Sequence, residues 1–136
     1  MQEGQGGPAL SFKCTDTIEA YKFVQPDTSE CAGGKIVVEE GSAGSKCMGI
    51  TASATAAANR TVSVFTDYGR ICYLNCDGDT GSAITPGTRL KSDADGQGVP
   101  VASDHDECGA VAMDSTSAAS AIIKVMLTPM ALYETG

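Results

Sequence analysis

Apolar and polar residues alternate along most of the chain, in short runs separated by turn-forming residues. Val62 and Val64 lie two residues apart, and Ile123, Val125 and Leu127 repeat this spacing near the end of the chain. Successive side chains of a β-strand point to opposite faces, so a period of two predicts strands with one buried face. Ten strands are expected, over residues 9–14, 20–25, 35–40, 46–52, 61–66, 70–76, 88–91, 97–102, 109–114 and 121–128.

Loops rich in Gly, Ser, Thr and Asp separate these strands, and no long segment has the period of an amphipathic helix. One or two short helical turns are expected, at Thr15–Glu19 and in the alanine-rich segment Ser53–Arg60. The apolar run Arg70–Cys76 is typical of a strand that is buried on both faces or that crosses a barrel. The fold class is therefore predicted to be all-β, mainly strands with these short turns, in a small barrel or sandwich.

Aspartate–glycine pairs mark two tight turns. Asp93-Ala94-Asp95-Gly96 lies between two predicted strands, and Gly accepts a positive φ angle, so the segment predicts a β-hairpin. Asp77-Gly78-Asp79 predicts a second turn. A calcium-binding EF-hand loop would need further oxygen ligands at fixed positions and flanking helices, and neither segment fits that pattern.

A weak internal repeat links the two halves of the chain. Cys47–Ala52 leads through an alanine-rich loop to the apolar strand Val62–Phe65, and Cys108–Met113 leads through a small-residue loop to Ile123–Leu127. Two similar hairpins suggest a duplicated β unit, although a sequence with so few residue types also produces such similarity by coincidence.

The chain divides into three parts by composition. Residues 1–8 are rich in Gly and Gln without an apolar anchor, so they predict a flexible N-terminal arm. They also lack the basic and apolar regions of a secretory signal. Residues 9–130 are expected to form a single β domain, followed by a C-terminal tail at 131–136. No apolar run approaches the length of a membrane span.

Charge and residue size exclude several classes of partner. The chain has 9 Lys and Arg against 17 Asp and Glu, which gives a net charge of −8. Nucleic acids and anionic membranes attract basic surfaces, so neither is expected as a partner. Trp is absent and only 5% of residues are aromatic, whereas ligand pockets usually have large apolar walls. No small-molecule substrate is expected.

The six cysteines leave three interpretations open. They are Cys14, Cys31, Cys47, Cys72, Cys76 and Cys108. Buried thiols, one or more disulfides, and metal ligands all agree with an even number of cysteines at irregular spacing. On a strand, Cys72 and Cys76 share a face but lie too far apart to form a disulfide with each other.

His105, the only histidine, is the one residue that invites a catalytic hypothesis. It lies in the acidic segment Ser103–Cys108, beside a thiol. On an extended chain His105 and Cys108 point to opposite faces, and the neighbouring acids disfavour a thiolate. The chain contains no nucleophile elbow, phosphate-binding loop or dinucleotide fingerprint. We therefore expect no enzymatic activity, no cofactor and no bound metal, with a small enzyme or metal-binding protein as the least favoured hypothesis.

Three segments resemble the head-decoration (cement) proteins of tailed bacteriophages. They are Thr88–Val99, Cys108–Asp114 and Ile122–Leu127. In that family a hairpin of the form G-x-x-L-x-S-D-A-D-G-x-x-V precedes a strand pair of the form G-x-A-x-x-x-A-S-A-x-x-x-I-x-V-x-L. Segments of the first half correspond to further strands of the family, and the resemblance covers residues 9–128.

The resemblance implies a β-tulip-like fold and a mechanical function. A protein of this kind binds the outer surface of the expanded phage head and bridges major capsid protein subunits, commonly as a homotrimer. It is part of the virion and is assembled in the host cytoplasm. The alternative is another structural β module of the virion, such as a head fibre base, a tail-tube component or an adhesin.

The predicted arm supplies the candidate contact residues. An arm with unpaired backbone groups can add a strand to an exposed sheet edge on the capsid. The candidates for capsid contact are Gln2, Glu3, Gln5, Pro8 and Leu10. Many symmetric copies would offset the entropy that each arm loses on binding.

Overall fold

The protein is an all-β chain, as a computed structural model shows for residues 9–31, 36–43, 47–52, 56–79, 83–101 and 107–132. All ten predicted strands are found, with ends that differ by a few residues. They are β1 (Leu10–Cys14), β2 (Phe23–Pro26), β3 (Val37–Glu40), β4 (Gly49–Thr51), β5 (Thr61–Phe65), β6 (Ile71–Cys76), β7 (Arg89–Ser92), β8 (Gly98–Pro100), β9 (Glu107–Ala112) and β10 (Ala121–Leu132). Among the residues described, no helix is long and apolar enough to cross a membrane.

The expected helical turns are wrong where the structure describes the chain. Ile18 forms an isolated antiparallel bridge with Ala56, and the two residues exchange backbone hydrogen bonds of 3.0 and 2.9 Å. The bridge holds the β1–β2 loop against the β4–β5 loop. A single helical turn is weak by itself, so this long-range pairing determines both loops. Residues 53–55 of the alanine-rich segment lie outside the described residues.

The alternating pattern translates directly into buried and exposed faces. In β6 the side chains of Cys72, Leu74 and Cys76 are buried, whereas Tyr73 between them is 38% exposed. Of the two interpretations of the apolar run at 70–76, the barrel strand is therefore correct and burial on both faces is wrong.

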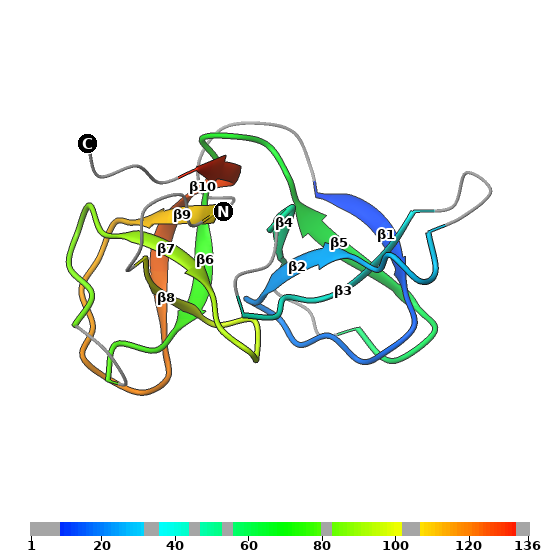
Figure 1. The fold of residues 1–136 in the computed structure, drawn as a ribbon, viewed down its shortest axis with the longest axis horizontal. Helices are drawn as coiled ribbons and strands as arrows, with labels where there is room; N and C mark the ends of the chain where they lie inside the picture. Colours follow the sequence, from blue (N-terminus) through cyan, green and yellow to red (C-terminus); the bar gives the residue numbers. More distant parts are fainter. Residues whose placement is uncertain are drawn as a thin grey trace.

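The strands close into two small barrels that lie side by side (Figure 1). The first barrel has the strand order β1-β3-β2-β4-β5, and the second has the order β10-β6-β8-β7-β9. β1 runs parallel to β3 in the first barrel, and β6 runs parallel to β8 in the second. All other neighbouring strands are antiparallel. The predicted small barrel is thus present twice.

The two barrels are copies of one unit. β1 to β5 correspond in chain order to β6 to β10, and the registers correspond as well. Val24 pairs with Gly49 in the first barrel, as Leu90 pairs with Ala110 in the second. A second isolated bridge joins the β6–β7 and β9–β10 loops, as in the first barrel. The repeat predicted from two hairpins is confirmed, and it includes all five strands.

The buried apolar side chains form two clusters. One lies within the first barrel, and it consists of Cys14, Ile18, Val24, Val38, Ala56, Val62 and Val64. The larger cluster fills the second barrel, but it also includes Phe23, Cys47 and Ile50 of the first. Part of the first barrel therefore packs into the core of the second.

The last strand is longer than predicted. β10 reaches Leu132, with a shift of its pairing with β9 between Leu127 and Ala131. The strand therefore continues past the predicted end at Thr128. Residues 1–8 and 133–136 lie outside the described residues, so the division into arm, single domain and tail stays a prediction.

Candidate functional site

Most of the predicted contact residues fall outside the described part of the chain. Gln2, Glu3, Gln5 and Pro8 precede it, and His105 lies in the gap at 102–106. Leu10 is described: it begins β1, pairs with Val64 of β5 and is 53% exposed.

The cysteines of the chain are all thiols, so the disulfide interpretation is wrong and the thiol interpretation is confirmed. Five of them are buried, and Cys31 is half-buried. Burial raises the pKa of Cys72 and of Cys76 to about 12, because a thiolate is poorly solvated in the barrel interior. These two thiols are therefore protonated at neutral pH and act as small core residues rather than nucleophiles.

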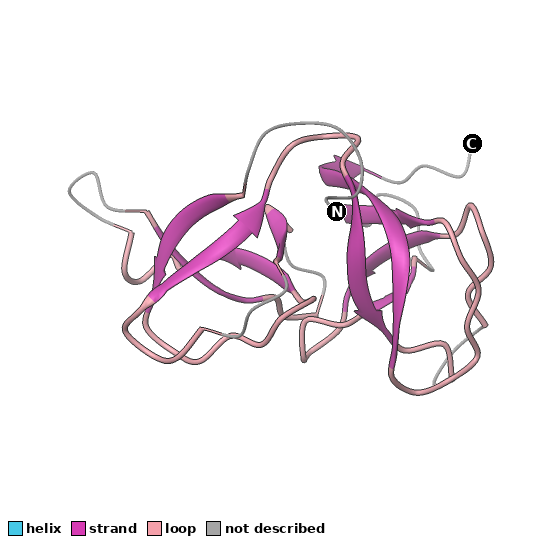
Figure 2. Ribbon diagram, turned by 180° about the vertical axis from the view of Figure 1, so that it is seen from behind, coloured by secondary structure: helices cyan, strands magenta, loops and turns pink. Residues whose placement is uncertain are grey.

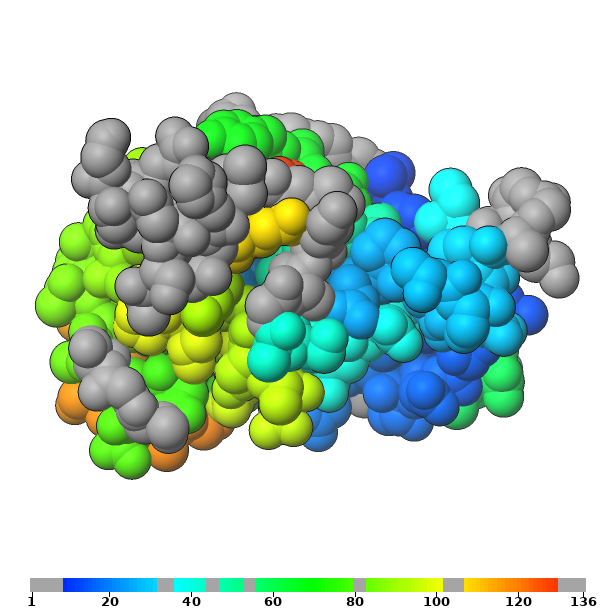
Figure 3. Space-filling view, viewed as in Figure 1, coloured from blue at the N-terminus to red at the C-terminus, as the bar shows by residue number. Residues whose placement is uncertain are grey.

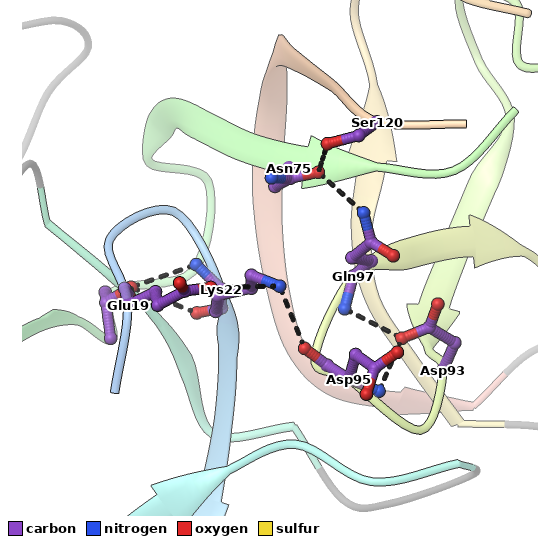
Figure 4. Close-up of polar contacts among 8 residues, drawn as sticks. Glu19, Lys22, Asn75, Asp93, Asp95, Gln97 and Ser120 are labelled. Atoms are coloured by element: carbon purple, nitrogen blue, oxygen red, sulfur yellow. Dashed lines mark hydrogen bonds and ion pairs between the residues drawn. The ribbon is translucent and has the colours of Figure 1, made fainter. Parts of the chain in front are cut away.

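The β7–β8 turn connects the two barrels (Figure 4). The Asp93 carboxylate accepts hydrogen bonds from the backbone N–H groups of Asp95 and Gln97, at 2.8 and 2.9 Å. These bonds shape the predicted aspartate–glycine hairpin. The turn then presents the Asp95 carbonyl to Lys22 of the first barrel, whose Nζ donates to it at 3.1 Å. In Figure 3 the turn (yellow-green) lies against the segment that follows β3 (cyan).

Lys22 is a nearly buried cation among carboxylates. Its side chain is 9% exposed, and Nζ lies 3.7 Å from Oε1 of Glu19. Burial raises the pKa of Glu40, and the negative charges of Glu19, Asp95 and Asp93 add to this effect, whereas Lys22 opposes it. The lysine therefore neutralises an acidic cluster at the contact between the barrels.

Tyr21 occupies a strained position in order to reach the second barrel. Its φ angle is 62°, in the left-handed region that costs a non-glycine residue about 1 kcal/mol or more. Gly87, with φ 94°, occupies the corresponding position of the second barrel. The Tyr21 carbonyl accepts a 2.7 Å hydrogen bond from the Asn75 N–H, and its ring meets Tyr73 edge-on at 6.4 Å. These contacts with the second barrel explain why position 21 is a tyrosine, although the corresponding residue of the second barrel is a glycine.

Arg70 fixes the connection between β5 and β6. Its guanidinium lies 4.5 Å from the centre of the Phe65 ring and 3.3 Å from the Asp67 carboxylate, and the residue is 1% exposed. The backbone of Gly69 and Arg70 exchanges two 2.7 Å hydrogen bonds with Leu127 of β10. With the β7–β8 turn, this linker holds the barrels in one arrangement.

The outer side of the second barrel carries a group of accessible apolar side chains. Tyr73, Met113 and Ile122 are 38%, 48% and 52% exposed, and three half-buried residues lie beside them. In Figure 2, β6 and β10 run along the near side of this barrel. We call this surface the second-barrel face, and it consists of Ile71, Tyr73, Val111, Met113, Ile122 and Met126.

Two of the corresponding positions in the first barrel are polar, whereas Ile50 and Phe65 correspond to Val111 and Met126. Cys14 lies in the parallel pairing of β1 with β3, and Cys76 lies in the parallel pairing of β6 with β8. These two cysteines correspond, and counting back three residues from each places Ser11 where the second barrel has Tyr73. The β1–β5 and β6–β10 registers place Thr61 where the second barrel has Ile122. The first barrel thus folds with Ser and Thr at these two positions, whereas Tyr73 of the second barrel packs against Tyr21.

Sequence reasoning missed the second-barrel face, although a signal for it was available. The repeat aligns Val62 with Ile123, and this alignment places Thr61 beside Ile122. The comparison of Ser11 with Tyr73 needs the register of the first half of each unit. The repeat found in the sequence covers only the second half.

Comparison with known proteins places this arrangement in a family. The sequence matches the phage cement protein family over residues 18–127, which span most of both barrels. The fold is similar to that of the N base of the head fibre gp8.5 in bacteriophage phi29, with a TM-score of 0.67 and 11% sequence identity. That likeness covers 93% of this chain and 98% of the other. No curated protein sequence matches the chain.

Two copies of a barrel whose interiors are filled by apolar side chains make up the fold, and the family match gives its class. The chain belongs to the phage cement proteins, and the predicted family is thereby confirmed. It is a decoration protein of the phage head, a component of the virion that binds the capsid.

Proposed function

We propose that this protein binds the outer surface of the expanded phage head and bridges neighbouring major capsid protein subunits. Membership of the phage cement family is the observation that carries the proposal. The rigid connection between the barrels supports it, because a bridge transmits load between subunits only if its two parts keep their arrangement. The role is mechanical, without catalysis, and the site of assembly is the host cytoplasm.

The protein acts on the shell as a homotrimer. The resemblance to decoration proteins supports this oligomeric state, since such proteins commonly occupy three-fold positions. Symmetric copies also multiply a weak contact, because each further contact of a bound trimer forms at high effective concentration.

The N-terminal arm adds contacts to the shell. Leu10 supports this part of the proposal, because it is an apolar residue that stays 53% exposed at the start of β1. The arm residues Gln2, Glu3, Gln5 and Pro8 precede it in the chain. Deletion of residues 1–9 is expected to lower occupancy on the shell, since it removes backbone groups that can pair with a capsid strand.

The direct test adds the purified protein to undecorated expanded heads. We expect saturable binding in a sedimentation assay, trimeric density on the outer surface by electron microscopy, and a higher temperature of head rupture. The 1–9 deletion is measured in parallel, with its thermal unfolding as the control for folding. Absence of binding by the intact chain contradicts the proposal, and unchanged occupancy of the deletion variant contradicts the role of the arm.

A head fibre base is the second candidate function, and the similarity to the fold of the phi29 head fibre base favours it. The same micrographs distinguish the two. A cement protein forms a layer whose copies contact several capsid subunits, whereas a fibre base carries a projecting fibre at each position.

A further inference from the structure

We propose that the contact between the two barrels responds to acid: Glu40 takes up a proton there, and its neutral form holds the β7–β8 turn more firmly than its charged form. We call this contact the joint. It is formed by Lys22, Glu40 and Gly41 of the first barrel with the end of β7 and the β7–β8 turn of the second. The inference concerns the free protein and does not depend on binding to the shell.

The joint leaves little space around Glu40. A Cβ placed on Gly96 would lie 2.8 Å from Cγ of Glu40, and one placed on Gly41 would lie 2.6 Å from Oγ of Ser92. The stem of Glu40 therefore packs directly on the backbone of the β7–β8 turn. Beside it, the Phe23 N–H donates a 2.8 Å hydrogen bond to the Gly96 carbonyl. The turn cannot move away from Glu40 without stretching this bond.

Negative charges outnumber positive ones around Glu40. Among the residues that the structure describes, four charged groups act on it from the two loops packed against it, namely Lys22, Glu19, Asp93 and Asp95. Lys22 is the only cation of the four, and its Nζ also interacts with the Asp95 carbonyl at 3.1 Å and with Glu19 at 3.7 Å. On the paired strand β2, the residue opposite Glu40 is the uncharged Val24. A charged Glu40 therefore adds a further negative charge to a partly desolvated contact.

The direction of the response follows from linkage. Burial raises the pKa of Glu40, Lys22 opposes this rise only in part, and the three neighbouring acids add to it. A carboxyl whose pKa is higher in the folded protein binds its proton more tightly there than in the unfolded chain, so protonation favours the folded state. This stabilisation is complete below the ordinary pKa of 4.5 and is lost as the pH rises through the raised pKa. The joint is therefore tightest in mild acid.

The experiment removes the group that takes up the proton. Glu40→Gln imitates the neutral side chain, and Glu30→Gln is the matched control, because Glu30 is an exposed glutamate between β2 and β3 and its loss changes the net charge equally. Urea unfolding of the intact chain and of both variants is measured at about pH 7 and about pH 4. Asp95→Asn, alone and combined with Glu40→Gln, reports coupling across the joint, since the Asp95 carbonyl can still accept from Lys22.

At pH 7 we expect the unfolding equilibrium constant of Glu40→Gln to be lower than that of the intact chain by about twofold or more, and this gain to disappear near pH 4, where the intact chain carries the proton itself. The control is expected to unfold like the intact chain, because its side chain lies in solvent. In the Asp95→Asn background the gain should be smaller, because one of the repelling charges is gone.

Three results of this experiment overturn the inference. They are a folded Glu40→Gln variant without a gain at pH 7, a gain that persists unchanged near pH 4, and a gain that is equal in the Asp95→Asn background. If Glu40→Gln does not fold, NMR titration of the intact chain decides. The Glu40 carboxyl then has to titrate above the ordinary value of 4.5, with the Phe23 amide shift following it, and a midpoint at or below that value overturns the inference.

Discussion

Gly109 is the residue that lets the two barrels touch. A Cβ at this position would collide with the Phe23 ring and would lie 2.9 Å from Cβ of Cys47. Both neighbours are 0% exposed, so neither can move into solvent. Gly109→Ala is therefore expected to lower the free energy of unfolding by about 1–3 kcal/mol, the usual cost of overpacking a core. Urea denaturation measures this change.

The Phe23→Leu variant supplies the control for this prediction. Phe23→Leu alone creates a cavity, but in the double variant the smaller side chain gives the new methyl group room. The double variant is therefore expected to be more stable than the sum of the two single changes implies. Simple additivity would contradict a steric clash between these two positions.

Lys22 determines the strength of the contact between two elements, the β1–β2 loop and the β7–β8 turn. Lys22→Met removes the hydrogen bond to the Asp95 carbonyl and leaves the nearby carboxylates without their cation. We expect a loss of about 1–2 kcal/mol at pH 7. At about pH 3 Glu40, whose pKa is raised by burial, is protonated, so its attraction to Lys22 is gone and the loss becomes smaller.

Thermal unfolding at both pH values measures the effect of Lys22→Met. Lys13→Met is the matched control, because Lys13 is an exposed lysine of β1 and its removal changes the net charge equally. A change within about 0.5 kcal/mol is expected for the control. An equal loss in both variants would mean that net charge, and not the buried position, determines the effect.

The sequence predicts the elements far better than it predicts their contacts. Strand positions follow from local alternation, and the Asp93–Gly96 turn follows from residues that are adjacent in the chain. The contact of Lys22 with Asp95 and the packing of Phe23 against Gly109 join segments far apart in sequence, and no local pattern encodes them. The expected helical turn at Thr15–Glu19 fails for the same reason.

The whole molecule is held together by a core that crosses from one barrel to the other. Phe23, Cys47 and Ile50 of the first barrel belong to the core cluster of the second. The Phe23 N–H also donates a 2.8 Å hydrogen bond to the Gly96 carbonyl. Unfolding of one barrel would therefore expose apolar surface of the other, which predicts one cooperative transition, in line with the single β domain expected for residues 9–130.

Two valines at corresponding positions test this cooperativity. Val64 of β5 and Val125 of β10 are both 0% exposed, and each lies in the core of its own barrel. Val64→Ala and Val125→Ala are each expected to lower the free energy of unfolding by about 2 kcal/mol. In calorimetry both variants should retain a single transition, with equal calorimetric and van't Hoff enthalpies, because the shared core couples the barrels. Two transitions, of which each variant shifts a different one, would instead show that the barrels unfold independently.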